Sequence, residues 1–233
     1  MRKFKRESGF TLVELAIVMV VIALLVTIVA AGKNIIAAGK VRAVLMEVDS
    51  IQSGFVRFQE KYSDLPGDMV DASSYWPMGT CGNPCDGNGN EQLFWNGAAG
   101  AGAYHEGAQA LHHLQLADMI GGDPALGHTG NAQLGVNMLS SKIANAGWAV
   151  DWNNIIANTN ALQLGGEGAG APNDGAVLHA KDAFAIDDKL DDGLASSGRV
   201  RAPTGGKCAP ATTYDLSVPN KTCILRFQLD SAL

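Results

Sequence analysis

The stretch Gly9-Phe10-Thr11-Leu12-Val13-Glu14-Leu15 opens an apolar run that continues to Gly32. Glu14 carries the only ionisable side chain in this run. As a helix, the 23 residues from Phe10 to Gly32 would extend about 34 Å, which is enough to cross a hydrocarbon core of about 30 Å. The sequence therefore predicts a membrane-spanning helix at the start of the chain, with one carboxylate in it.

Four basic residues precede the apolar run, and only Glu7 opposes them: Arg2, Lys3, Lys5 and Arg6. A basic flank keeps its own side of a spanning helix in the cytoplasm, so we expect the residues beyond Gly32 on the opposite side. This orientation predicts a single-pass protein of the bacterial inner membrane, with a periplasmic C-terminal domain.

Glu14 needs an explanation, because an unpaired carboxylate inside a membrane span is costly. A plain membrane anchor leaves Glu14 unexplained. A secretory signal cut after Val29-Ala30-Ala31 would need an apolar region of about 7–15 residues, and this run is longer. The third interpretation is cleavage between Gly9 and Phe10, which leaves the apolar helix on the mature protein.

The segment Lys5-Arg6-Glu7-Ser8-Gly9, followed by Phe10-Thr11-Leu12-Val13-Glu14-Leu15, resembles the class III signal of type IV prepilins and type II secretion pseudopilins. The resemblance covers roughly residues 5–35. It implies that a prepilin peptidase in the inner membrane cuts after Gly9 and methylates the new amino terminus at Phe10. It also implies that Glu14 is a carboxylate used in filament assembly.

Physical chemistry supports the same interpretation of Glu14. Cleavage would create a positive amine at Phe10 near a membrane face, and a buried charge needs a partner. Glu14 of a neighbouring subunit can supply that partner. The pair would also fix the axial step between subunits, because buried ionic pairs can define register.

Beyond Gly32, apolar residues recur in steps of three and four as far as Tyr62, and Pro66 is the first proline after Phe10. This spacing predicts one helix from about Phe10 to Tyr62, apolar all round in its first half and amphipathic in its second. We therefore expect three parts: a leader at residues 1–9, a transmembrane and assembly helix at residues 10–62, and a periplasmic domain at residues 63–233.

The domain is expected to combine short helices with a small antiparallel sheet. Helical patterns run from about Tyr104 to Met119 and over Ala183–Leu190, and strand patterns fall near Trp148–Trp152, Leu162–Leu164 and Cys223–Asp230. The last strand should be half-buried, with a mostly polar face containing Arg226 and Gln228, and Val200-Arg201-Ala202 is its candidate partner. The predicted fold class is α+β, a pilin-like long helix packed on a loop-rich domain.

The charge of the chain argues against a nucleic-acid partner. The formal net charge is −6, and residues 1–9 contain four basic residues and one acidic residue, so the remainder carries −9. An acidic domain without a basic patch has no electrostatic means of binding phosphate backbones.

The four cysteines lie beyond the membrane span and suit disulfides in an oxidising compartment. Cys81 and Cys85 are separated by three residues that include Pro84, which favours a small structural disulfide over a redox-active pair. Cys208 and Cys223 enclose a segment near the C-terminus, which resembles the disulfide-bounded region of many pilins. Zinc is the weaker alternative, since the two pairs lie far apart in the sequence.

Two acidic segments are candidates for calcium, and no other cofactor is expected. Asp86, Asn88 and Asn90 alternate as in the start of a calcium loop, but Gly97 stands where the bidentate glutamate of an EF-hand would be, and an ordinary surface turn explains the pattern too. The second segment contains Asp182, Asp187, Asp188, Asp191 and Asp192. Helical spacing would make Asp187 and Asp191, and Asp188 and Asp192, repel each other, which calcium or simple solvation would relieve. Type II secretion pseudopilins, which the chain resembles, carry a structural calcium near the C-terminus.

Histidines near the second predicted helix do not form a zinc motif. His105-Glu106 lacks a second histidine at the required spacing, where Gln109 stands instead. We interpret His105, His112 and His113 as surface or helix-end residues. No segment has the context of a catalytic nucleophile, so an enzyme is not expected.

Together these features predict a structural subunit of a type IV pilus or a type II secretion pseudopilus, two options that the sequence does not separate. Its expected partners are the inner membrane, prepilin peptidase, an assembly platform, and copies of itself or related pilins. The alternative is a membrane-tethered periplasmic binding domain that does not polymerise.

Overall fold

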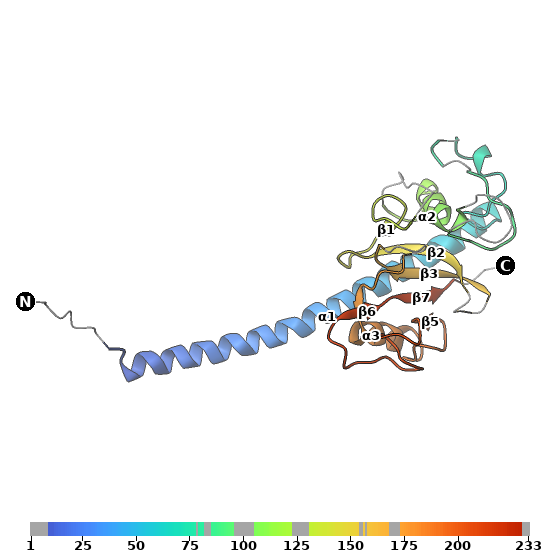
Figure 1. Cartoon of the computed structure of the whole chain (residues 1–233). Helices are drawn as coiled ribbons and strands as arrows, with labels where there is room; N and C mark the ends of the chain where they lie inside the picture. Colours follow the sequence, from blue (N-terminus) through green and yellow to red (C-terminus); the bar gives the residue numbers. More distant parts are fainter. Residues whose placement is uncertain are drawn as a thin grey trace, which may run out of the picture. The chain divides into compact units, whose positions relative to one another are not determined.

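The computed structural model describes residues 9–77, 79–81, 85–95, 105–122, 131–153, 156, 158–167 and 173–229. The chain divides into two compact units, the first ending at Gly39 and the second comprising Lys40–Leu233. The fold is α+β, as predicted (Figure 1). Helix α1, Leu12–Tyr62, belongs to both units.

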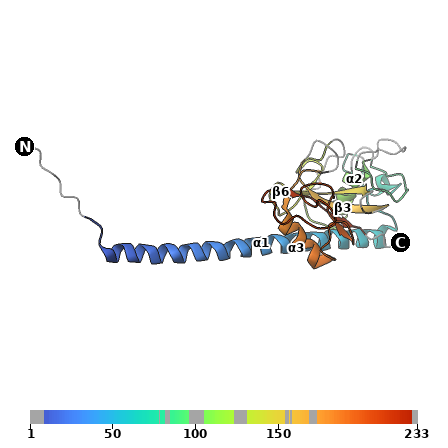
Figure 2. The ribbon, with the colours of Figure 1, turned by 60° about the horizontal axis from the view of Figure 1, so that its bottom comes forward.

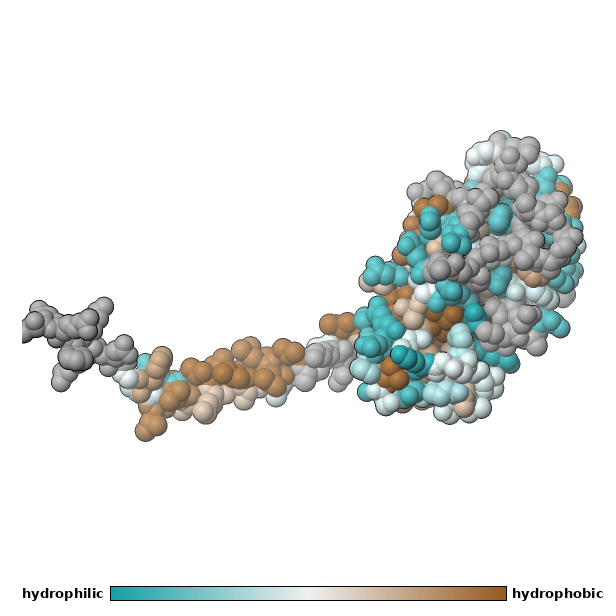
Figure 3. Space-filling model, viewed as in Figure 1, coloured by the Kyte–Doolittle hydropathy of each residue, from teal (hydrophilic) through white to brown (hydrophobic). Residues whose placement is uncertain are grey.

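In the first unit, the described segment Leu12–Val29 of α1 has no polar face. Leu12–Val29 is long and apolar enough to cross a membrane. The large apolar side chains of this segment are exposed, from 48% for Leu15 to 87% for Leu12. Figure 3 shows this part of α1 as a continuous hydrophobic surface. A helix that is apolar all round needs cover from lipid or from other helices.

In the second unit, α1 buries one stripe of side chains. The stripe residues follow the predicted steps of three and four, and all are buried: Val41, Val44, Val48, Ile51, Phe55 and Phe58. These side chains belong to the main hydrophobic core of the unit. The amphipathic pattern in the sequence therefore identified the buried face of this half of the helix.

A five-stranded antiparallel sheet packs over this stripe, in the order β1-β2-β3-β7-β5. Its strands are β1 (Leu139–Ser140), β2 (Gly147–Asn153), β3 (Thr159–Gly165), β7 (Leu225–Gln228) and β5 (Val200–Arg201). A separate two-stranded sheet pairs β4 (Leu178–His179) with β6 (Lys221–Cys223). The remaining elements are the 3-10 turn η1 (Ala72–Ser74), α2 (Glu106–Leu116) and α3 (Ala180–Leu190).

The five-stranded sheet packs on α1 in the second unit (Figure 2), and α2 contacts both β2 and α1, where the ring of Phe58 lies 6.3 Å from that of His113. On the α1 face, the indole Nε1 of Trp148 in β2 donates to Glu47 of α1 at 2.9 Å. On the opposite face, Ala149 of β2 packs in a small cluster with Ala108 of α2. Glycine at position 107 allows this close approach, because a Cβ there would collide with the carbonyl oxygen of Val150.

Two details of the predicted elements are wrong. The C-terminal strand is divided into β6 and β7, and Asp230 lies outside the described residues. The face of β7 expected to be polar is largely covered, since Arg226 is buried and Gln228 is half-buried. Arg226 is only 9% exposed, and its Nε donates to Oε1 of Gln163 in β3. The predicted pairing of Val200-Arg201 with this strand is confirmed.

Replacing Phe58 in the buried stripe by alanine should strongly destabilise the second unit. Phe58 is fully buried and stacks near Trp76 and His113. Phe58→Ala is expected to lower the free energy of unfolding by about 3–5 kcal/mol, because it leaves a cavity. Val56 lies on the exposed face of the same helix. Val56→Ala should change the free energy of unfolding by less than about 0.5 kcal/mol. Denaturant unfolding measures this free energy for both variants. Equal losses in the two variants would contradict the assignment of Phe58 to the buried stripe.

Candidate processing and assembly site

The first turn of α1 is held by a reciprocal pair of hydrogen bonds between Thr11 and Glu14. One carboxylate oxygen of Glu14, Oε2, accepts from the backbone N–H of Thr11 at 2.8 Å and from its hydroxyl at 2.9 Å. The backbone N–H of Glu14 donates to Oγ1 of Thr11 at 3.2 Å. Because α1 begins at Leu12, Thr11 is the N-cap and Glu14 the third helical residue, which is the arrangement of a capping box.

The capping box gives Glu14 a partner in its own chain. The partner expected from the sequence lies in a neighbouring subunit and is the amine at Phe10. The spacing Thr-x-x-Glu before an apolar run is a known start signal for helices, and it would have identified Thr11. Any pairing of Glu14 with another subunit must therefore compete with, or add to, the Thr11 hydrogen bonds.

Gly9 and Phe10 lie in an irregular segment immediately before the helix. Phe10 is largely exposed. A Cβ at position 9 would meet no other atom within 4 Å, so no packing contact in the structure requires glycine there. The reason for glycine at this position must lie outside the packing of the described residues.

Residues 4–30 match the family model described as the prokaryotic N-terminal methylation motif. The chain carries a type IV pilin-like methylation motif. The motif includes Gly9, Phe10, Thr11 and Glu14, and it indicates a protein that is processed as a prepilin. No curated protein and no solved structure matches the chain.

Both pairs of neighbouring cysteines form disulfides in the second unit. Cys81 is bonded to Cys85, and Cys208 to Cys223, which joins β6 to the loop before it. The bonded cysteines offer no thiolates, which zinc would require as ligands. The Cys208–Cys223 bond fixes the segment that returns to the central sheet.

The Asp86–Asn90 segment forms turns in which its polar side chains bond to nearby backbone groups. The carboxylate of Asp86 accepts from the backbone N–H of Ser73 at 2.7 Å and from its hydroxyl at 2.9 Å. The side-chain oxygen of Asn90 accepts from the N–H of Gln92 at 2.9 Å. These contacts correspond to the surface-turn interpretation of this segment.

The same segment wraps around a buried pair of carboxyl groups, Asp68 and Glu106, each 1% exposed. Asp68 accepts from the backbone N–H groups of Gly89 at 2.7 Å and Glu91 at 2.6 Å, and both acids accept from the N–H of Asn88. Burial, together with the charge and hydrogen bond of Asp68, raises the pKa of Glu106 to about 7. No sequence pattern links two acids so far apart in the chain.

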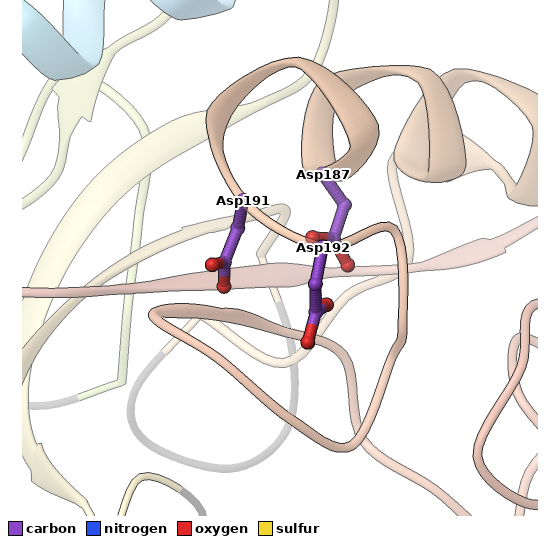
Figure 4. Close-up of side chains that lie close together, drawn as sticks. All are labelled: Asp187, Asp191 and Asp192. Atoms are coloured by element: carbon purple, nitrogen blue, oxygen red, sulfur yellow. The ribbon is translucent and has the colours of Figure 1, made fainter.

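Three of the predicted acidic residues come together at the end of α3 (Figure 4). One oxygen from each of Asp187, Asp191 and Asp192 lies within 4.8 Å of the others. Asp188 and Asp182 are not in this group. The predicted closeness of Asp187 and Asp191 is present, while Asp192 joins them from the loop after the helix rather than pairing with Asp188.

Hydroxyl and backbone donors from three separate positions orient these three carboxylates. The hydroxyl of Tyr214 donates to Asp187 at 2.6 Å, the N–H of Val200 donates to Asp191 at 3.0 Å, and the hydroxyl of Ser197 donates to Asp192 at 2.6 Å. Burial raises the pKa of Asp187 to about 6. Hydrogen bonds from Ser197 and Leu194 lower the pKa of Asp192. The arrangement offers oxygen ligands only, which is the chemistry that calcium prefers.

His105 lies at the N-terminal end of α2, as expected, but the expectation that His112 and His113 lie at the surface is wrong. His112 and His113 are buried, and Nδ1 of His113 accepts from the backbone N–H of Gly67 at 3.0 Å. The turn at Gly67 lies so close to α2 that a Cβ there would collide with the carbonyl of Glu106. Helix α2 is thus covered by this turn as well as by the sheet, which buries polar residues that helical periodicity would place outside.

Replacing Glu106 by glutamine should change how stability depends on pH. The pKa of Glu106 is about 7 in the folded chain and near 4.5 when unfolded, so its protonated form stabilises the fold below pH 4.5, and that contribution is lost as the pH rises through 7. Glu106→Gln keeps a neutral group at every pH. It should therefore raise the free energy of unfolding by roughly 1–3 kcal/mol at pH 8 relative to the unmodified chain.

The measurement is denaturant unfolding at pH 5 and pH 8. Glu60→Gln, on the exposed face of α1, is the matched control and should keep the pH dependence of the unmodified chain. Parallel pH profiles for Glu106→Gln and the unmodified chain would show that Glu106 is not protonated in the fold.

Proposed function

We propose that the chain is a structural subunit of a type IV pilus or a type II secretion pseudopilus. One observation carries the proposal: the methylation motif at residues 4–30 contains a helical segment, Leu12–Val29, whose apolar side chains are exposed on all sides. Prepilin peptidase cuts after Gly9 and methylates Phe10. Residues 1–9 are then the leader, residues 10–62 the transmembrane and assembly helix, and residues 63–233 the periplasmic domain.

The exposed apolar surface of the helix supports polymerisation, because lipid must cover it before assembly and other subunits must cover it afterwards. Before assembly the inner membrane surrounds the apolar surface of Leu12–Val29. After extraction the same surface would face water unless helices of other subunits covered it. The partners are accordingly copies of this chain or related pilins, with an assembly platform that transfers the subunit out of the membrane.

Glu14 supports the proposal through its position and its charge. In the single chain its carboxylate bonds to Thr11 through Oε2. The amine that cleavage creates at Phe10 of a neighbouring subunit can approach the same carboxylate, since an ionised carboxylate accepts several hydrogen bonds. That ion pair, formed away from water, fixes the axial step between subunits.

Two substitutions separate the charge of Glu14 from its capping role. Glu14→Gln can still cap the helix, because glutamine also forms capping boxes, but it cannot form the ion pair. Thr11→Ala removes the cap and leaves the charge. We expect Glu14→Gln to lower filament yield at least about 10-fold, the effect of losing roughly 1.4 kcal/mol per subunit contact, and Thr11→Ala to have a smaller effect.

Filament yield is measured in sheared fractions by electron microscopy, and cleavage at Gly9 by mass spectrometry of the amino terminus. Membrane insertion and cleavage should stay unchanged in both variants. A membrane-tethered binding domain that does not polymerise would give no filament fraction with the unmodified chain and no effect of Glu14→Gln. A normal filament yield with Glu14→Gln would contradict the proposed ion pair.

We also propose that calcium binds at Asp187, Asp191 and Asp192, where the structure gathers three carboxylate oxygens. A bound calcium takes six to eight oxygen ligands, so the carboxylates would be completed by backbone oxygens or water. Calcium would offset the repulsion among three acids and stabilise the loop that leads from α3 to β5.

Thermal melting of the full chain, with and without a calcium chelator, tests this site. Adding calcium after chelation should raise the melting temperature by several degrees, since a ligand that binds only the folded state stabilises it. Asp191→Asn should abolish this increase, whereas Asp182→Asn, outside the group, should retain it. An unchanged melting temperature on chelation would rule out a structural calcium at this position.

A further inference from the structure

A polar pocket lies in the second unit, where the C-terminal end of α1 meets the ends of β2 and β3. Its volume is about 370 Å³, within the roughly 300–1,000 Å³ of small-molecule sites. One side is formed by Ser63 and Asp64 after α1, and another by the turn Gly89–Gln92. The sheet contributes Trp152 and Asn160. The methylation motif and the acidic group at α3 are not part of this pocket.

Trp152 provides an apolar surface in this polar pocket. It pairs across the sheet with Asn160, so both side chains project from the face that also packs on α1. The indole is half-buried, and its ring lies 6.4 Å from that of Phe94. A tryptophan held in this way offers a rigid ring face to a ligand at little cost in conformational entropy.

Two buried polar residues hold the walls of the pocket in place. The side chain of Asn160 accepts from the N–H of Leu93 at 2.8 Å and donates to the carbonyl of Glu91 at 2.9 Å. Asp68, on the floor, binds the backbone of the turn that contains Gly89 and Glu91. The pocket is therefore preformed by a network of hydrogen bonds rather than by loosely placed loops.

Other polar side chains of the pocket remain available to a ligand. Among the described residues, no side-chain hydrogen bond engages the side chains of Ser63, Glu91, Gln92 and Asn158. The hydroxyl and the two amides can each donate and accept, and the carboxylate accepts. A ligand with several adjacent groups that both donate and accept would match this set.

Three residues that line the pocket have an unusual backbone conformation. Ser63, Glu91 and Asn158 all have positive φ, at 55°, 64° and 52°. Only five non-glycine residues of the described chain adopt such angles, and three of them line this pocket. Strained backbone of this kind persists where the surrounding structure fixes it, and it gathers at ligand-binding sites.

Charge restricts the class of ligand. Asp64, Asp68 and Glu91 line the pocket, and none of the described residues that line it is a lysine, arginine or histidine. Anionic ligands would be repelled. We propose that this pocket binds a non-anionic sugar unit, whose ring stacks on Trp152 and whose hydroxyls bond to Ser63, Glu91, Gln92 and Asn158. An inorganic cation would use few of these donors and would leave the indole unused.

The proposal is tested on the full chain in phosphatidylcholine nanodiscs, which contain no sugar. Isothermal titration and tryptophan fluorescence would follow the addition of neutral hexoses, their N-acetylamino forms, and glucuronate, up to about 50 mM. At least one neutral sugar should bind saturably. Glucuronate should bind at least about 10-fold more weakly than its neutral counterpart, because of the carboxylates in the pocket.

Variants assign the binding to this pocket. Trp152→Leu should weaken sugar binding at least about 10-fold, through loss of the stacking surface. Asn158→Ala should weaken it about 3- to 10-fold, through loss of a hydrogen bond. Asn145→Ala is the matched control, because Asn145 is also exposed with positive φ but lies outside this pocket. Circular dichroism would verify that each variant is folded.

Three results would overturn the proposal. The first is the absence of saturable binding by every neutral sugar with the folded, unmodified chain. The second is saturable binding of calcium alone or of argininamide that Glu91→Gln abolishes, without sugar binding, which would make the pocket a cation site. The third is equal weakening by Asn158→Ala and Asn145→Ala.

Discussion

Burial of the α1 stripe from Val41 to Phe58 is the contact on which the second unit depends. The sheet places Trp148, Leu162 and Phe227 in the same core as this stripe, and α2 contributes Leu111 and Leu114. Without the helix, the face of a sheet whose strands are at most seven residues long would be left exposed to water. The α1 stripe therefore covers the apolar face of this sheet, as a second sheet does in a β-sandwich.

The opposite face of the sheet has a different chemistry, since polar residues are buried there. Gln163 and Arg226 bond to each other on the strands, and Asp151 accepts from the N–H of Trp95. Away from this face, Asp68 and Glu106 form a second buried polar group under the turn that contains Gly89 and Glu91. Buried polar groups of this kind are stabilising only when each has a partner, so they specify the path of the loops more than they add to stability.

Periodicity was enough to predict α1, α2, the strands near Trp148 and Leu162, and the pairing of Val200 with the C-terminal strand. These elements are set by local apolar patterns, which a sequence displays directly. The burial of His113 was not predictable, because the turn at Gly67 covers α2 only in the folded domain. The burial of Arg226 likewise involves its contact with Gln163 on a neighbouring strand. The capping box could be predicted from the spacing of Thr11 and Glu14. The contact between Asp68 and Glu106 could not be predicted, because only the tertiary fold brings these residues together.

The position of the capping box has a consequence for the proposed cleavage. Among the described residues, the side-chain hydrogen bonds that start α1 join Thr11 to Glu14, and none of them involves Gly9 or Phe10. The proposed cleavage after Gly9 would therefore leave these hydrogen bonds in place. It would change the charge and the end group of the chain and would not remove the groups that begin the helix.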